Sequence, residues 1–271
     1  MWYQIKSFIK FYWKSITKYN VQSPFLFDFV TNILDTEKEY YRFLDIENQR
    51  KELKESTYSI EVKDLGAGSK SLDRKTRKVS QIAHTSVSGE TKCRILFNLA
   101  LHYKAKNILE LGTSLGISSS YLSCSDSHAN IISLEGDPKI ADIAKEVHLN
   151  LGLKNVQVNI GPFIETLSDS LLQLQKVDLV FLDGHHAMDP TLQYFDEILP
   201  YCHNHSIIVI DDIYWSEDMQ TAWKRLIERP EVSLSVDLYD IGIIFFRKEL
   251  TKSSISYISY KYKPWRIGLF G

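Results

Sequence analysis

Acidic residues and histidines follow two apolar segments of the chain. VDLVFLDGHH places Asp183, His185 and His186 after one apolar run, and IIVIDD places Asp211 and Asp212 after another. Three carboxylates, those of Asp183, Asp211 and Asp212, together with water would form the hard oxygen site that Mg2+, Mn2+ or Ca2+ prefers. Neighbouring strand residues point to opposite faces, so Asp211 and Asp212 converge on one ion only where the strand gives way to a loop. Helix capping and loop hydrogen bonds are the alternative for these acids.

His186 is the candidate general base of this group. A histidine that titrates near neutrality suits the removal of a proton from a hydroxyl group. The alternative is a structural role, in which His186 caps the next helix or pairs with Asp196. Trp215 follows the acidic pair and is expected at the edge of an acceptor pocket, whereas Trp223 is expected in the core.

A second chemical signal is the glycine-containing segment ILELGTSLGISSSYL, residues 108–122. Gly112 and Gly116 allow close backbone approach, and the following helix start offers N–H groups to a carboxylate or phosphate. The dinucleotide pattern G-x-G-x-x-G is not met, because Ser114 occupies its second glycine position. Glu135 closes the next apolar run, about two dozen residues after Gly112, where a carboxylate can accept hydrogen bonds from a ribose. We therefore predict a nucleoside site that does not hold a pyrophosphate.

Alternating strands and helices must position these residues. Five apolar runs bounded by turn signals predict strands separated by helices: 107–111, 131–135, 156–160, 177–182 and 206–210. This alternation indicates βαβ units and a Rossmann-like, doubly wound α/β fold. Residues 232–238 and 241–247 predict a hairpin that adds an antiparallel edge. We expect a mostly parallel sheet of about seven strands.

The first 84 residues are predicted to be an N-terminal helical extension with a flap, followed by the main domain, 85–250, and a tail, 251–271. Residues 2–16 form a basic amphipathic helix, with Lys6, Lys10, Lys14 and Lys18 and no acid before Asp28. We expect its apolar stripe to pack against the same chain or a twin subunit rather than a membrane surface. Residues 61–87 are predicted to be either a substrate flap or a solvated basic helix after a loop at Gly66.

ELGTSLGIS, SLEGDP, VDLVFLDGHH and IIVIDDIYW, in this order and at these separations, resemble a class I S-adenosylmethionine-dependent methyltransferase over residues 85–248. The resemblance implies S-adenosylmethionine as cofactor. It assigns residues to the cofactor as follows: Glu110, Gly112, Thr113 and Gly116 surround its methionine part, Ser88 or Gly89 closes over its carboxylate, and Glu135 holds the ribose. Many relatives carry an acid that reads the adenine amine where this chain has Gly161, Pro162 and Phe163, so here we expect Phe163 to contact the adenine. Asp183 is expected to help position the cofactor if it does not bind a metal.

The glycine spacing is similar to that of the catechol O-methyltransferase branch, and DGHH resembles the D-G-x-H pattern of bacterial methyltransferases acting on sugars and secondary metabolites. In the metal-dependent enzymes the matching places hold Asp, Asp and Asn, so Asp212 replaces the Asn. His186 falls where the catechol branch keeps its catalytic lysine. The resemblance thus implies O-methylation of a small hydroxylated acceptor, with Mg2+ or another divalent cation as a candidate second cofactor.

Composition sets the remaining expectations. A net charge of -2 argues against nucleic acid as a partner. Three widely spaced cysteines favour a reduced, cytoplasmic protein, and no apolar run is long enough to span a bilayer. The sequence does not decide whether the chain forms a homodimer. Two rival functions remain, a non-catalytic cofactor-binding or scaffold module and a nicotinamide-dependent oxidoreductase, and the missing central glycine argues against the second.

Overall fold

A computed structural model describes residues 2–63 and 74–263 of the chain. The chain divides into two compact units, which we call the central unit, Asp35–Leu179, and the terminal unit, Met1–Leu34 with Val180–Gly271. No helix within the described ranges is both long and apolar enough to cross a membrane. The described cysteines, Cys93, Cys124 and Cys202, are free thiols.

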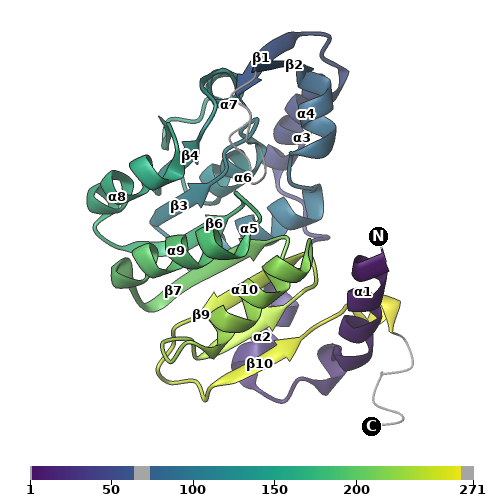
Figure 1. Ribbon diagram of the computed structural model, residues 1–271. Helices are drawn as coiled ribbons and strands as arrows, with labels where there is room; N and C mark the ends of the chain where they lie inside the picture. The colour runs from purple at the N-terminus through teal and green to yellow at the C-terminus, as the bar shows by residue number, and fades with distance from the viewer. Residues whose placement is uncertain (1, 64–73, 264–271) are drawn as a thin grey trace. The chain divides into compact units, whose positions relative to one another are not determined.

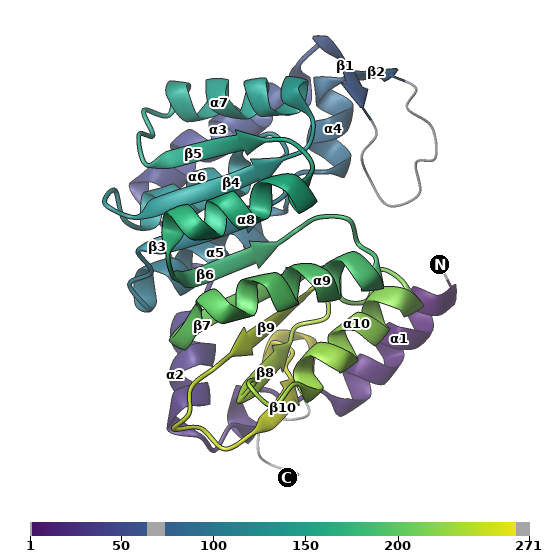
Figure 2. The same cartoon turned by 60° about the vertical axis from the view of Figure 1, so that its left-hand side comes forward.

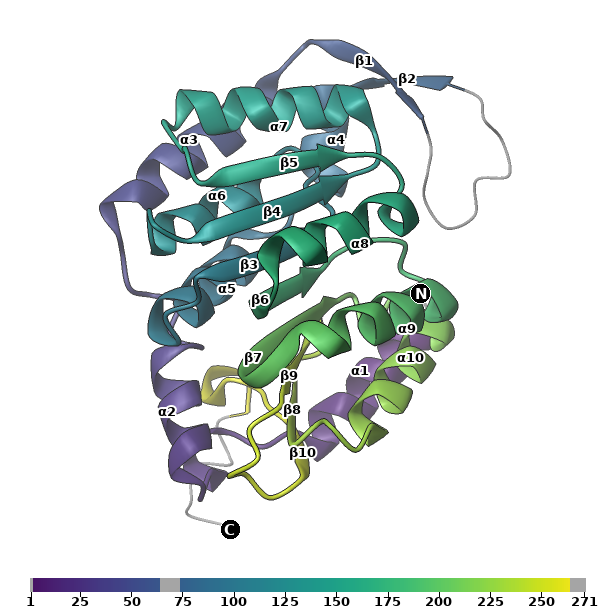
Figure 3. The same cartoon turned by 90° about the vertical axis from the view of Figure 1, so that its left-hand side faces the viewer.

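The central unit contains parallel strands with helices on both sides. Its strands are β3 (Asn107–Leu111), β4 (Asn130–Glu135), β5 (Val156–Ile160) and the first half of β6 (Val177–Leu182). Its sheet helices are α5 (Glu90–His102), α6 (Ile117–Ser125), α7 (Pro138–Asn150) and α8 (Phe163–Leu174). Figure 3 shows α8 in front of β3 and β4, with α5 and α6 behind them. β3 pairs with β4, and β4 with β5, in parallel. The carboxyl ends of these strands therefore share one edge.

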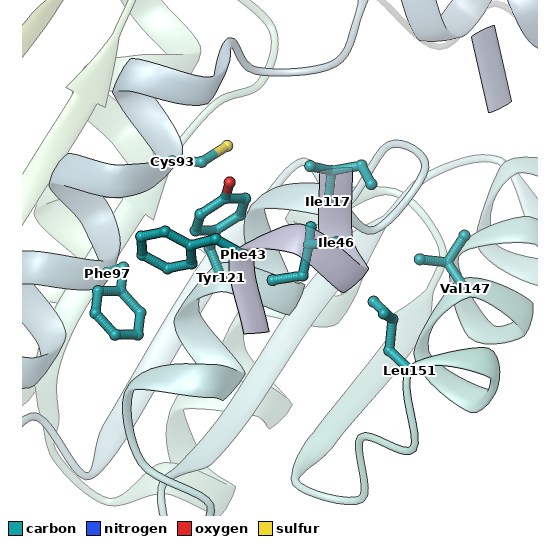
Figure 4. Packing of buried hydrophobic residues seen from close by; sticks show 8 residues of the cluster. All are labelled: Phe43, Ile46, Cys93, Phe97, Ile117, Tyr121, Val147 and Leu151. Carbon is teal, nitrogen blue, oxygen red and sulfur yellow. The ribbon is translucent and has the colours of Figure 1, made fainter. Parts of the chain in front are cut away.

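Aromatic packing joins α3 (Tyr41–Glu55) to the helices behind the sheet. Phe43 packs edge-on against Phe97, with ring centroids 4.8 Å apart, and lies 4.8 Å from the ring of Tyr121. All three side chains are buried, and Figure 4 shows them with Cys93 and Ile117 in one cluster. Contacts of this kind add to the hydrophobic stabilisation from burial. They hold α5 and α6, the helices that flank the predicted cofactor residues.

A two-stranded hairpin precedes this sheet. β1 (Ser59–Lys63) and β2 (Arg74–Lys78) pair in antiparallel fashion, and α4 (Val79–Thr85) follows. Figure 1 shows the hairpin beside α3 and α4. The predicted basic helix is therefore wrong for Arg74–Lys78, because Ile60 and Val62 bury against Val79 on α4 and favour an extended pairing. The predicted loop around Gly66 lies outside the described residues.

The terminal unit combines the second half of β6 with β7 (Cys202–Asp211), β8 (Leu234–Asp237), β9 (Ile241–Phe245) and β10 (Ser253–Ser256). Its helices are α1 (Trp2–Lys14), α2 (Pro24–Asn32), α9 (Met188–Ile198) and α10 (Glu217–Glu228), with short 3-10 turns at Lys18–Asn20, Leu199–Tyr201 and Tyr260–Tyr262. In Figure 2, α9 and α10 lie side by side along β7, β8 and β9. β9 is antiparallel to both β7 and β8, which confirms the predicted hairpin.

The main sheet has eight strands in the order β10-β8-β9-β7-β6-β3-β4-β5 and is mostly parallel. The predicted Rossmann-like α/β fold is confirmed, but the expectation of about seven strands missed β10. β10 pairs in parallel with β8 at the edge of the sheet. Its sequence, Ser-Ser-Ile-Ser, lacks the apolar pattern of a buried strand, and both Ser253 and Ser254 are exposed.

Candidate active site

The predicted site residues fall into two groups, one in each unit. Residues assigned to the cofactor, from Ser88 to Phe163, belong to the central unit. The histidine and the carboxylates Asp183, Asp211 and Asp212 belong to the terminal unit.

The glycine loop turns back onto β4 as soon as β3 ends. The N–H groups of Gly112 and Thr113 both donate to the carbonyl oxygen of Leu134, each at 3.0 Å. Gly112 has φ 103° and Ser114 has φ 47°, so two residues of the turn take left-handed backbone conformations. Such a conformation costs a non-glycine residue free energy, and the observed hydrogen bonds must hold Ser114 there. The turn brings the loop next to the end of β4, as the sequence predicted.

Glu135, the last residue of β4, is fixed by backbone amides. One carboxylate oxygen accepts a 2.8 Å hydrogen bond from the N–H of Ser114, and the other accepts a 3.0 Å hydrogen bond from the N–H of Asp137. Burial raises the pKa of Glu135, and the hydrogen bonds from Asp137 and Ser114 partly offset this rise. Asp137 in turn caps α7 by accepting from the N–H groups of Lys139 and Ile140. The carboxylate is thereby held in one orientation beside the glycine loop.

Glu110 lies one residue before the end of β3 and is fully buried. The hydroxyl of Ser133 donates to its Oε2, and Ser133 also contacts the hydroxyl of Thr113 at 2.5 Å. Burial raises the pKa of Glu110 to about 7, although hydrogen bonding by Ser118 and Ser133 lowers it in part. The other oxygen, Oε1, is buried and has no well-aligned hydrogen-bond donor within the described part of the chain. A buried carboxylate oxygen in this state suits a cationic ligand group.

Gly116 has a packing role. It begins α6 with φ +80°, and a Cβ atom there would lie 2.9 Å from Nε2 of His148 and 3.1 Å from Cα of Ala144 on α7. His148 is buried and sits within 2.9 Å of the Ser119 hydroxyl. The glycine thus allows α6 and α7 to approach closely. Its predicted contact with the cofactor stays a prediction.

Ser88 and Phe163 are the outer members of the predicted cofactor group. Ser88 precedes α5, and its carbonyl oxygen accepts a 2.6 Å hydrogen bond from the guanidinium of Arg50. Arg50 is buried and pairs with Glu47 at 2.9 Å. Phe163 is the first residue of α8 and is buried. Sequence reasoning missed Arg50, although its i, i+3 spacing from Glu47 on a helix was a readable signal of an ion pair.

In the terminal unit, His186 lies between two carboxylates. Its Nε2 is 3.7 Å from Oδ1 of Asp183, and its Nδ1 is 3.7 Å from Oδ2 of Asp212. Both distances exceed hydrogen-bond length and lie within ion-pair range for a charged ring. His185 contacts the hydroxyl of Tyr194 instead, at 3.1 Å. Asp196, the alternative partner of His186, forms an ion pair with Arg229.

The backbone around this histidine is strained. His185, His186 and Asp212 have φ values of 63°, 31° and 53°, in the region that L-residues rarely adopt. Strain of this kind costs about 1 to 3 kcal/mol per residue and concentrates at functional sites. At Asp212 it turns the side chain away from the direction that β7 would impose.

The structure does not form the predicted metal cluster from Asp183, Asp211 and Asp212. Within the described residues, no three His, Cys, Asp or Glu side chains are arranged to hold a metal ion. Asp211 remains in β7, is 4% exposed, and accepts a hydrogen bond from the N–H of Asp212. Asp183 and Asp212 lie on either side of the His186 ring, each 3.7 Å from one of its nitrogens.

A recess of about 350 Å3 opens beside Asp212. Its lining residues are Gln4, Asp212, Tyr214, Trp215, Tyr239 and Asp240. The rings of Tyr214 and Tyr239 stack with centroids 4.8 Å apart, and Trp215 is 59% exposed. Trp223 is buried, as the sequence predicted, and Trp215 lies at the edge of the recess.

Residues 109–213 match a family described as a methyltransferase domain. A catechol O-methyltransferase from Niastella koreensis is 32% identical over 118 residues, which cover 42% of this chain and 52% of that relative. The chain therefore spans about half the length of the curated relative that it matches.

Solved structures of methyltransferases share the fold. An SAH-bound methyltransferase from Podospora anserina superposes with a TM-score of 0.58 at 17% identity, covering 84% of this chain and 98% of that one. An O-methyltransferase from Bacillus cereus in complex with SAH has a TM-score of 0.55 at 18% identity, covering 80% and 96%. Residues 109–213 therefore resemble a methyltransferase domain, and the chain shares the fold of solved methyltransferases, in agreement with the resemblance found in the sequence.

Proposed function

We propose that this protein transfers the methyl group of S-adenosylmethionine to a hydroxyl oxygen of a small acceptor. The observation that carries the proposal is Glu135, at the end of β4 within the matched domain, with both oxygens oriented by the amides of Ser114 and Asp137. A carboxylate offers about four acceptor positions, so capacity remains for ribose hydroxyls. This is the position at which nucleoside-binding α/β folds recognise the sugar.

The residues present fit the cofactor in a second way. Oε1 of Glu110 is a buried carboxylate oxygen without a well-aligned donor from the described residues. The methionine part of S-adenosylmethionine carries an ammonium group, which would supply both the missing donor and the missing positive charge. When bound, the cofactor supplies an activated methyl group. Ser133 and Thr113 would hold Glu110 in place through their linked hydroxyls.

His186 is the proposed acceptor of the hydroxyl proton. Asp183 and Asp212 stand on either side of its ring, and both would stabilise the imidazolium that forms when His186 takes up the proton. Both carboxylates lie 3.7 Å from the ring nitrogens, beyond ordinary hydrogen-bond length, and the His186 side chain is 34% exposed, so we propose that the acceptor hydroxyl reaches one ring nitrogen. Proton removal by a positioned side chain contributes about 100- to 10,000-fold to rate.

The same arrangement gives the acidic residues a role that needs no divalent cation. With His186 between Asp183 and Asp212, the two carboxylates act on the histidine, and we derive no step through a metal ion. We expect methyl transfer to persist in the presence of a chelator. Loss of activity with chelator, restored by Mg2+ or Mn2+, would return these acids to the role of metal ligands.

The recess beside Asp212 suggests the acceptor. Tyr214, Trp215 and Tyr239 provide flat apolar surfaces, and Asp212 and Asp240 add negative charge. Aromatic walls bind phenolic rings and the apolar faces of sugars. The carboxylates disfavour anionic acceptors. We therefore propose a neutral or cationic, hydroxylated ring compound as the substrate class.

Binding and turnover test separate parts of this proposal. S-adenosylmethionine and its demethylated product are expected to raise the melting temperature, whereas NAD is not, because only a ligand of the native state stabilises it. Methyl transfer is then measured with labelled S-adenosylmethionine and panels of phenolic and sugar acceptors. Binding of the cofactor without transfer to any acceptor would favour the non-catalytic module. Stabilisation by NAD instead of S-adenosylmethionine would refute the proposal.

Replacing the proposed base tests the mechanism. His186→Gln is expected to lower kcat by about 100-fold or more while leaving cofactor affinity near that of the wild type. His128→Gln is the matched control, because the side chain of His128 is 88% exposed and contacts Asp126 on a remote turn. Equal activity of the two variants would exclude His186 as the base.

A further inference from the structure

The N-terminal helix α1 presents two different faces. Along one face, Gln4, Ser7, Phe11 and Lys14 contact the terminal unit, and Ser7 and Phe11 are buried. Along the other face, Trp2, Ile5, Ile9 and Trp13 are 85%, 48%, 51% and 68% exposed. Four large apolar side chains at helical spacing thus lie on the surface. Within the described residues the same chain leaves these four side chains exposed, so of the partners expected for the stripe a twin subunit stays a prediction.

The helix is firmly attached through its inner face. The hydroxyl of Tyr239 donates to the carbonyl of Gln4 at 2.7 Å, and Lys14 pairs with the buried Asp237 at 2.9 Å. At its carboxyl end, the buried Lys263 donates to the carbonyl oxygens of Trp13 and Ser15, at 3.2 and 2.9 Å. In Figure 1, α1 is the purple helix beside the yellow C-terminal segment. The attachment fixes the direction of the outer face.

The outer face points away from the unit because of helix geometry. Ile9 and Phe11 are two residues apart, which places them about 160° apart around an α-helix. Phe11 packs against the rings of Tyr214 and Tyr239. Ile9 must therefore lie on the opposite side. The stripe from Trp2 to Trp13 is about 16 Å long, too short to span a bilayer but long enough to lie on one.

The charges beside the stripe define its partner. Lys6 and Lys10 are exposed next to Ile5 and Ile9, and Lys18 follows the helix. The sequence contains no acidic residue before Asp28. Two copies of this face paired about a two-fold axis in antiparallel orientation would bring their lysine rows together, and α1 itself carries no acid to compensate them. A surface with negative charge and an apolar interior matches the stripe better.

We propose that the outer face of α1, formed by Trp2, Ile5, Ile9 and Trp13, docks in the plane of a membrane surface that contains anionic lipid. The apolar side chains enter the boundary between headgroups and acyl chains, where tryptophan is favoured, and Lys6 and Lys10 contact lipid phosphates. An isolated helix of this length would have to fold on binding, whereas α1 is already folded and oriented. Gln4, which lines the recess at Asp212, lies on the inner face. Docking therefore leaves the recess open.

Vesicle flotation with the full chain tests this proposal. The protein is expected to float with vesicles of phosphatidylcholine and phosphatidylglycerol, and less with phosphatidylcholine alone or at high salt. Lys6→Ala/Lys10→Ala is expected to weaken binding roughly 25-fold, at about fivefold per lysine near an anionic surface. Lys51→Ala/Lys139→Ala is its control, because both side chains are exposed in the central unit, at 73% and 62%.

The apolar contribution needs its own variants. Ile5→Glu/Ile9→Glu and, separately, Trp2→Ala/Trp13→Ala are expected to abolish flotation, with an unchanged melting temperature. Leu44→Glu/Leu149→Glu is the control, because it removes two exposed apolar side chains of the central unit, at 69% and 77% exposure. This variant is expected to float like the wild type.

Three results would overturn the proposal. The wild type could float with neither vesicle, the Leu44→Glu/Leu149→Glu control could lose flotation as completely as the α1 variants, or the wild type could be a dimer in solution that only the α1 variants dissociate. The last result would assign the face to self-association. Because cofactor binding and turnover with a free acceptor do not depend on the outer face, failure here leaves the proposed function intact.

Discussion

Gly116→Ala probes the close approach of α6 to α7. Gly116 has φ +80°, a conformation that costs an L-residue roughly 1 to 2 kcal/mol. The new Cβ would lie 2.9 Å from Nε2 of His148 and 3.1 Å from Cα of Ala144, and overpacking against backbone costs about 1 to 3 kcal/mol. We therefore expect the free energy of unfolding to fall by about 2 to 5 kcal/mol, measured by urea unfolding with tryptophan fluorescence.

The structure offers a control that separates the two contributions. Gly152 has φ +66°, but a Cβ there would meet nothing within 4 Å. Gly152→Ala should therefore cost only the backbone contribution, about 1 to 2 kcal/mol. If Gly116→Ala proves no more destabilising than Gly152→Ala, with the same denaturant slope, the packing argument is refuted. A displaced α6 should also weaken cofactor binding in Gly116→Ala but not in Gly152→Ala.

Three further predictions concern the buried titratable groups. Burial lowers the pKa of His148 from 6.5 to about 4, so the neutral ring stabilises the fold above pH 6.5. Roughly 3 kcal/mol of the free energy of unfolding is lost as pH falls to 4. In pH-dependent urea unfolding, His148→Gln should not show this loss. Burial raises the pKa of Glu110 from 4.5 to about 7, so the stabilisation of the fold by its neutral carboxyl is fully present below pH 4.5. Roughly 3 kcal/mol of the free energy of unfolding is lost as pH rises through 7. The free energy of unfolding of Glu110→Gln should depend less on pH over this range. Calorimetry of Glu135→Gln should show S-adenosylmethionine binding weakened about 10- to 100-fold, because hydrogen bonds to a charged group are worth about 1.5 to 3 kcal/mol. Unchanged affinity would exclude the ribose contact.

Most strand positions were predictable because central strands of a parallel sheet are buried on both faces. The predicted limits 107–111 and 177–182 coincide with the buried strands β3 and β6, and the limits 156–160 coincide with β5, a half-buried strand at the edge of the sheet. Apolar runs of this kind stand out between amphipathic helices. β10 and β2 did not stand out, because their sequences, SSIS and RKTRK, are polar. Their strand conformation depends on partners, β8 and β1, that local sequence does not specify.

The candidate site was likewise predictable from the sequence only in part. The proximity of the Gly112 loop to Glu135 followed from parallel topology, because both lie at carboxyl ends of adjacent strands. The roles of Ser133 and Arg50 did not follow, since each acts through a side-chain contact made in the folded chain, with Glu110 and with the carbonyl of Ser88. Contacts of this kind depend on rotamer and register, which periodicity does not encode.

The acidic residues show why residue type alone does not separate a metal site from an oriented base. Asp183, Asp211 and Asp212 have the composition and spacing of a hard-cation site, and the same carboxylates also suit an imidazolium. Backbone geometry determines where these side chains lie. With φ 53° at Asp212 and 31° at His186, the ring comes to lie between two acids 3.7 Å away on either side. Asp211, the acid that stays in β7, is left to bind the amide of its neighbour. A sequence with the same aspartates but an apolar residue at position 186 would lose the group that now lies between them, so its carboxylates would repel each other unless a cation bound there.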